Sequence, residues 1–112
     1  MGKRFGWHSG DLTAASLTMN SISYRVAAGA IPLDGATTLI STVGGANALT
    51  LANGIEGQIK VLAMIADAGD GTVTPDNLAN GSTILFDDVG DCAILLFING
   101  EWYMLGGTAT LA

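Results

Sequence analysis

Apolar and polar residues alternate along most of the chain after residue 20, with the period of two that is typical of β-strands with one buried face. In 21–26, Ile22, Tyr24 and Val26 fall on one face and polar residues fall on the other, which predicts a half-buried strand. The segment 57–66 begins with the same alternation but ends with apolar residues on both faces. A strand of that kind is entering a core or a contact between subunits, and 92–98 has a similar character.

Three Asn-Gly pairs separate successive apolar segments. Two of them belong to the tetrapeptide "LANG", which occurs at 51–54 and again at 78–81, and the third is Asn99-Gly100. Asparagine and glycine both tolerate a positive φ, which the type I′ turn of a two-residue hairpin requires at both positions. Because apolar runs lead directly into and out of Asn99-Gly100, the sequence predicts a hairpin there. The sequences that follow the two tetrapeptides differ, which favours recurring turn chemistry over a duplicated coil or blade.

The spacing of these segments predicts an all-β fold. We count roughly seven to nine short strands at intervals of about ten residues, as in sandwiches, jelly rolls and small barrels. The sixteen glycines oppose long helices, and 112 residues correspond to one domain. We therefore predict a single-domain antiparallel β-sandwich or jelly-roll-like barrel over 21–112, preceded by an irregular N-terminal arm over 1–20.

The composition favours association between copies of the chain. Charged residues make up 12% of the sequence, about half of the usual ~25%, while apolar residues make up 49%. A small domain has much surface for its volume and normally needs many charges to remain hydrated. We therefore expect part of the surface to face another protein. The alternative is a weakly charged monomer covered by Ser, Thr, Asn and Gly.

The net charge of −6 excludes two classes of partner. After the pair Lys3-Arg4 the only basic residues are Arg25 and Lys60. They are too few for the phosphate contacts of nucleic-acid binding or for polybasic attraction to a membrane. No apolar run reaches the length of about 18 residues that suggests a membrane span, and the N-terminus lacks the apolar segment of a secretion signal. We expect a protein made or assembled in the interior of a cell.

The candidate chemical residues do not combine into a reactive centre. Cys92 is the only cysteine and lies in an apolar run, as a small buried residue does. His8 is the only histidine, and no nucleophile elbow accompanies it. Acidic residues gather in 67–76 and 87–91, where a Gly-rich loop could offer oxygen ligands to calcium, but the EF-hand spacing is missing. We expect solvated loop carboxylates, and we predict no catalytic, metal-binding or cofactor-binding residues.

Large side chains suggest where copies of the chain would meet. Trp102 and Tyr103 are adjacent in a predicted strand, so one of them joins the core and the other faces outward or toward a neighbour. Aromatic residues are enriched in interfaces, and the arm carries two more rings. The predicted interface residues are Phe5, Trp7, Leu62, Met64, Leu95, Phe97, Trp102 and Tyr103.

Residues 36–107 resemble a recurring type of small bacteriophage virion protein. The resemblance is carried by "GQIKVLAMIA" from Gly57, "GTVTPDNLANGSTILFDDVGD" from Gly71 and "AILLFINGEWYMLGG" from Ala93. Modules similar to this one occur in capsid cement (decoration) proteins and in fibre or other tail-associated proteins.

The resemblance to the decoration type implies a function for the chain. Such proteins are typically homotrimers at three-fold or quasi-three-fold axes of the capsid, where they bridge neighbouring copies of the major capsid protein. By this resemblance the chain would bind the exterior of the assembled head, in a virion assembled in the host cytoplasm, and stabilise it without catalysis. Two alternatives stay open. One is a tail-fibre or receptor-binding module whose loops at 67–76 contact a host glycan, and the other is a small carbohydrate-active enzyme.

Overall fold

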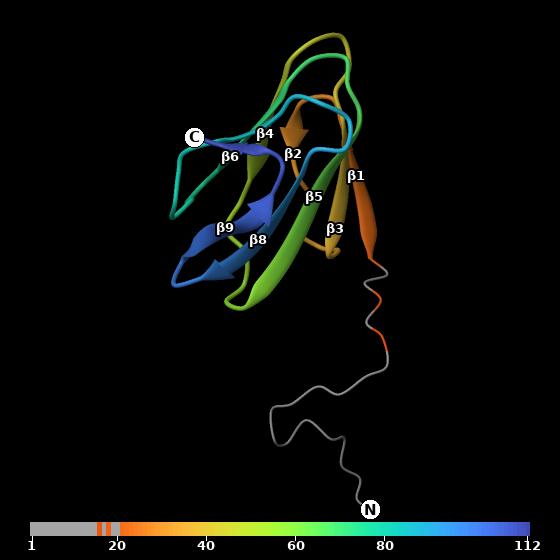
Figure 1. Cartoon of the computed structure of the whole chain (residues 1–112). Coiled ribbons are helices and arrows are strands. Elements are labelled where there is room, and N and C mark those ends of the chain that lie inside the picture. The colour runs from red at the N-terminus through yellow and green to blue at the C-terminus, as the bar shows by residue number, and fades with distance from the viewer. Residues whose placement is uncertain (1–15, 17, 19–20) are drawn as a thin grey trace, which may run out of the picture.

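Two five-stranded β-sheets face each other in the computed structural model, which describes residues 16, 18 and 21–112 (Figure 1). Sheet A has the strand order β1-β3-β5-β8-β9, and sheet B has the order β10-β7-β6-β4-β2. The strands are β1 (Ile22–Val26), β2 (Gly29–Ala30), β3 (Thr37–Ser41), β4 (Asn47–Leu51), β5 (Gln58–Ala66), β6 (Gly71–Pro75), β7 (Ile84–Phe86), β8 (Cys92–Ile98), β9 (Glu101–Gly107) and β10 (Thr110–Leu111). The described residues contain no helix, and the predicted all-β sandwich is confirmed.

The first six strands form a coil in which the chain passes alternately through sheet A and sheet B. Each strand therefore enters its sheet from the same end as its predecessor there, and neighbours within a sheet are parallel. In sheet A, for example, Ile22 lies opposite Thr37, which lies opposite Val61. The predicted antiparallel arrangement is wrong for these four pairings, because alternation along a strand defines its faces but not the direction of its partner.

The last four strands return in antiparallel pairs. β8 pairs with β5 and with β9, and β7 pairs with β6 and with β10. Asn99 and Gly100 join β8 to β9 with φ values of 56° and 76°. Both central residues of this connection are left-handed, as a type I′ turn requires, so the predicted hairpin is confirmed.

The other two Asn-Gly pairs have a different role. None of their four residues has a positive φ, so neither pair forms a type I′ turn like that of Asn99-Gly100. The first pair lies in the connection that crosses from β4 in sheet B to β5 in sheet A. In the parallel register Leu51 lies opposite Pro75, not opposite Leu78, so the two tetrapeptides do not occupy equivalent places in the coil.

Inward-facing residues of both sheets form one core, with Trp102 fully buried in it. The indole Nε1–H of Trp102 donates a hydrogen bond to the carbonyl oxygen of Ala52 at 2.9 Å. Its ring lies edge-on to Phe97, with 5.1 Å between the ring centroids and 69° between their planes. The remaining core residues are Ile31, Ile40, Leu49, Leu51, Leu62, Met64, Val73, Ile84, Phe86, Ala93, Leu95 and Ala109.

Candidate functional site

The outward side of sheet A exposes large apolar side chains on β1, β5 and β8. In β1, β3, β5 and β8 the outward positions carry no charged residue, because Arg25 and Lys60 both fall on the inward side of their strands. We name the exposed members of this surface the apolar face. It consists of Ile22, Tyr24, Val26, Ile59, Ile65, Ile94 and Ile98, each at least 39% exposed.

The outward side of sheet B has a different character. Its exposed strand positions are occupied by small or hydroxylated residues, as expected for a sheet face in contact with water. They are Ala30, Ala48, Thr50, Thr74 and Thr110. The outward sides of the two sheets therefore differ in polarity, and the apolar face is confined to sheet A.

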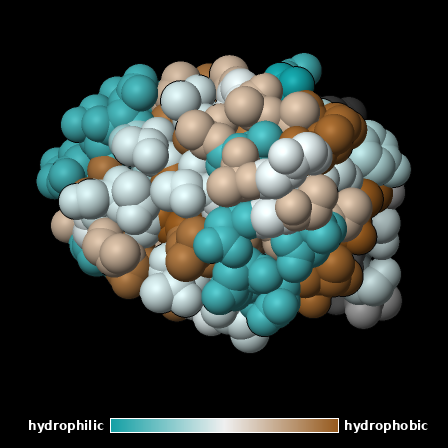
Figure 2. Space-filling model, turned by 90° about the horizontal axis from the view of Figure 1, so that it is seen from above, coloured by the Kyte–Doolittle hydropathy of each residue, from teal (hydrophilic) through white to brown (hydrophobic). Residues whose placement is uncertain are grey.

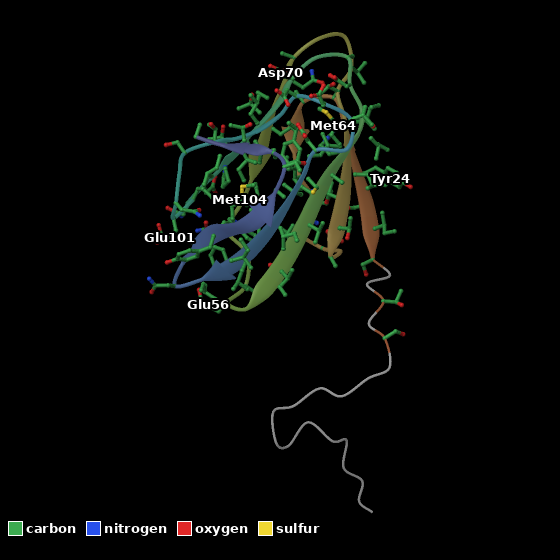
Figure 3. All side chains as sticks on the ribbon, viewed as in Figure 1. Tyr24, Glu56, Met64, Asp70, Glu101 and Met104 are labelled. Atoms are coloured by element: carbon green, nitrogen blue, oxygen red, sulfur yellow. The ribbon has the colours of Figure 1, made fainter. Side chains whose placement is uncertain are left out.

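In strand β1 the apolar residues face outward and the polar residues face inward. Tyr24 is 63% exposed and projects away from the sandwich (Figure 3). The polar residues of β1 instead lie on the inward side: the hydroxyl of Ser23 is 2.8 Å from that of the buried Thr38. The guanidinium of Arg25 donates to the carbonyl oxygens of Val26 at 2.8 Å and Ala30 at 3.4 Å. The sequence predicts the strand correctly, but its apolar face points outward.

The apolar face is a large exposed apolar surface. Four strands about 4.8 Å apart, with a longest strand of nine residues at about 3.3 Å each, bound the outward area of β1, β3, β5 and β8 at roughly 400 to 600 Å². The largest apolar patch on a typical monomer has about 300 to 600 Å², and such patches are often functional. One partner in a standard interface contributes about 800 Å², so the apolar face alone is smaller than a standard interface.

Five predicted interface residues lie elsewhere. They point between the two sheets and are at most 4% exposed, so they pack within one chain and present no surface to a neighbour. These residues are Leu62, Met64, Leu95, Phe97 and Trp102. Tyr103 is half-buried in β9, and Phe5 and Trp7 lie outside the described residues. Cys92, which the sequence predicts to be buried, is half-buried at the start of β8.

Sequence reasoning missed the residues that form the apolar face. The signal was present, since 57–66 and 92–98 are apolar on both faces and therefore predict a second contact. What the pattern left undecided is which of two apolar faces points between the sheets. The larger core residues occupy one set of positions, and the isoleucines of the alternate set are left outside.

The acidic loop at 87–91 is organised by its own backbone. One carboxylate oxygen of Asp91 accepts hydrogen bonds from the backbone N–H groups of Asp87 at 3.0 Å and Asp88 at 3.1 Å. These backbone hydrogen bonds lower the pKa of Asp91. A hydrogen bond between the carboxyl groups of Asp87 and Asp91 raises the pKa of Asp87. Such a loop needs no ligand to account for its conformation.

The second acidic loop lies at the same end of the sandwich. There the carboxylate of Asp67 accepts a hydrogen bond from the backbone N–H of Gly69 at 3.0 Å, and Thr42 joins the loop to the end of β3. Seen from above, this end shows polar groups (teal) interspersed with apolar ones (brown) (Figure 2). In the described part of the chain, no three His, Cys, Asp or Glu side chains are grouped so that they could hold a metal ion.

Comparisons with known proteins leave the apolar face as the main guide to function. No protein-family model matches the sequence, and a search of curated proteins finds no similar chain. Over residues 16, 18 and 21–112, the structure contains no helix that is long and apolar enough to cross a membrane.

Proposed function

We propose that the protein is a structural subunit that associates through the apolar face, and that it serves as a capsid cement protein of a bacteriophage. The observation that carries the proposal is the apolar face itself: besides the apolar residues that it buries in the core, sheet A exposes large apolar residues on its outward side, while Arg25 and Lys60 face inward. Association that removes exposed isoleucine and tyrosine side chains from water lowers the free energy of the system. The resemblance of 36–107 to virion proteins supports the identity of the assembly.

The proposed partners are further copies of the chain, as a homotrimer, and the major capsid protein on the exterior of the head. A cement protein acts by mass action: it binds the assembled shell better than the free subunits and so shifts the equilibrium toward the shell. Trimer formation multiplies weak contacts, because binding of one subunit raises the effective concentration of the others. This activity needs apolar surface and shape, and it needs no reactive residue.

A fibre or receptor-binding module is the second candidate, and one observation favours it. The coil of β1 to β6 stacks three parallel layers, as solenoid proteins do, and its first layer leaves both β1 and β2 at sheet edges. A preceding part of a fibre could continue such a coil. The cement proposal accounts better for the apolar face, which runs across sheet A rather than along its edge.

The apolar face is tested by introducing one charge into it. Tyr24→Glu is expected to weaken self-association at least tenfold, because a carboxylate buried in an apolar contact costs more than about 1.4 kcal/mol. Thr50→Glu is the matched control, because it adds the same charge to an exposed position of a strand in sheet B. Sedimentation equilibrium measures both, and circular dichroism reports whether each variant is folded. A wild-type chain that stays at 11.3 kDa at high concentration would contradict the proposal.

The place of the protein in the virion needs a separate experiment. Purified protein is mixed with undecorated capsids and sedimented, with Tyr24→Glu and Thr50→Glu alongside. We expect the wild type and Thr50→Glu to co-sediment with capsids and Tyr24→Glu to remain in the supernatant. Binding to host cells without binding to capsids would favour the fibre module instead. Turnover of a glycan by the pure protein would overturn both structural roles.

A further inference from the structure

An open groove lies at the end of the sandwich where β5 begins. It has a volume of about 500 Å³, within the range of roughly 300 to 1,000 Å³ that is usual for binding pockets. Its walls are two loops, 31–36 before β3 and 52–57 before β5. The lining residues are Leu33, Asp34, Gly35, Ala36, Asn53, Gly54, Ile55, Gln58 and Ile59.

Hydrogen bonds hold the two walls in place. The side chain of Gln58 donates from Nε2 to the carbonyl oxygen of Leu33 at 2.9 Å and accepts at Oε1 from the backbone N–H of Ile55 at 3.0 Å. Beneath the groove, Nζ of the buried Lys60 donates to the carbonyl oxygen of Gly35 at 2.9 Å. The groove is therefore a formed feature of the fold rather than a gap between loose loops.

Gly54 lines the groove at a place where a side chain has no room. A Cβ atom at this position would collide with Oε1 of Gln58 and would lie 2.9 Å from the Trp102 ring. A side chain here would displace Gln58, which links the two walls. The first "LANG" tetrapeptide thus supplies a close approach instead of a hairpin turn.

The groove leaves apolar side chains in contact with water. Ile55 is 79% exposed, the largest value among the exposed large apolar residues of the described chain, and Ile59 is 49% exposed. Ile59 belongs both to the groove and to the apolar face, while the exposed Asp34 adds a negative charge to the lining. Such a groove fits an occupant with large apolar side chains and a positive charge beside them.

The N-terminal segment of the chain has this composition. In 1–20, Lys3 and Arg4 stand next to Phe5 and Trp7, and the formal charge is +1 because Asp11 is the only acid. Residues 21–112 have two basic and nine acidic residues, which gives −7 and accounts for the net charge of −6. The segment and the sandwich are therefore complementary in charge.

The segment is also tethered beside the groove. Its last residue precedes Ser21, whose carbonyl oxygen accepts a hydrogen bond from the backbone N–H of Thr37 at 3.2 Å. The same oxygen would lie 3.3 Å from a Cβ atom on Gly35, a residue of the groove. Fourteen residues separate Trp7 from Ser21 along the sequence, and a random-coil chain of that length has an average span of about 20 Å. A link of that length gives an effective concentration in the millimolar range.

We propose that residues 1–20 of the same chain dock in this groove, with the rings of Phe5 and Trp7 against Ile55 and Ile59 and with Lys3-Arg4 near Asp34. The contact forms within one molecule and does not depend on the proposed role in a capsid. Its function is to cover the apolar walls of the groove and to fix where the N-terminus leaves the sandwich.

The test follows the indole N–H resonances of the full-length protein by NMR. The chain has two tryptophans, and Trp7→Phe identifies the Trp7 signal by its loss. We expect the Trp7 resonance to differ from its position in urea and to show nuclear Overhauser contacts to methyl groups of Ile55 and Ile59. Ile55→Asp should return the Trp7 resonance to its position in urea. Val43→Asp, an equally drastic change at an exposed residue away from the groove, should leave it in place.

Further measurements decide between the remaining outcomes. The Trp102 resonance must stay dispersed in Ile55→Asp, which shows that the sandwich is folded. If the Trp102 resonance loses its dispersion, the double variant Lys3→Glu/Arg4→Glu is used instead of Ile55→Asp. It should likewise return the Trp7 resonance to its position in urea. A mixture of labelled and unlabelled chains separates contacts within a molecule from contacts between molecules. A Trp7 signal at its urea position in the wild type, or contacts only between molecules, would overturn the proposal.

Discussion

Trp102→Ala is expected to lower the free energy of unfolding by about 4 to 5 kcal/mol. The ring is fully buried, and truncation of a buried aromatic residue to alanine usually costs about 3 to 5 kcal/mol. The indole also donates to the carbonyl oxygen of Ala52 at 2.9 Å, and loss of such a hydrogen bond costs about 1 kcal/mol. A domain of this size has a total stability of roughly 5 to 15 kcal/mol, so the variant should lose between about a third and nearly all of its stability.

Two further variants show how much of the loss in Trp102→Ala comes from the hydrogen bond and how much from burial of the ring. Trp102→Phe keeps a ring against Phe97 but loses the hydrogen bond, and we expect a loss of about 2 kcal/mol. Tyr103→Ala removes the neighbouring ring, which is half-buried in the same strand. We expect it to cost about 1 kcal/mol, the usual effect of a substitution outside the core.

Urea unfolding followed by far-ultraviolet circular dichroism measures these differences. The experiment is repeated at two protein concentrations, because association would make the unfolding midpoint depend on concentration. We expect the loss in Trp102→Ala to be the same at both concentrations, since its contacts lie within one chain. A loss below about 1.5 kcal/mol, or a loss of oligomer mass with an unchanged unfolding midpoint, would refute the assignment of Trp102 to the core.

Two further predictions concern the hairpin and the buried lysine. Gly100→Ala places a Cβ atom at a φ of 76° and should cost about 1 to 2 kcal/mol in the same urea experiment; unchanged stability would mean that the turn has another conformation. Burial lowers the pKa of Lys60 below 10.5, so the folded protein releases this proton at a lower pH than the unfolded chain does. Lys60 therefore destabilises the fold most below its folded pKa, and stability recovers as the pH rises toward 10.5. The unfolding free energy of the wild type relative to Lys60→Met should therefore rise as the pH is raised toward 10.5, and a difference that does not change with pH would contradict this reasoning.

The local elements could be predicted from the sequence, because they depend on neighbours along the chain. Alternation predicts the strands at 21–26, 57–66 and 92–98, and the dihedral preferences of Asn99 and Gly100 predict their hairpin. Both are properties of a few consecutive residues. The apolar surplus of the composition likewise predicts exposed apolar surface, and the structure places such a surface on the outward side of sheet A.

The candidate site could not be located in the same way. Leu62 and Ile59 are both apolar residues of one strand, and only the packing of sheet B against sheet A buries Leu62 and leaves Ile59 exposed. For the same reason the sequence prediction assigned Trp102 and Phe97 to an interface, although they pack on each other within one chain. Whether an apolar residue of such a strand is buried or exposed depends only on which side of its sheet packs against the other sheet.

Strand alternation, turn chemistry and a shortage of charge were thus present in the sequence alone, because each is a property of residue types and their spacing. The parallel coil of β1 to β6, the choice of buried face and the groove beside Gly54 were decided only by the tertiary structure. Each depends on segments far apart in the chain: Ile22 meets Thr37, Thr37 meets Val61, and Gly54 approaches Trp102. A local pattern carries no information about such partners, because the free energy that selects them comes from packing of the whole fold.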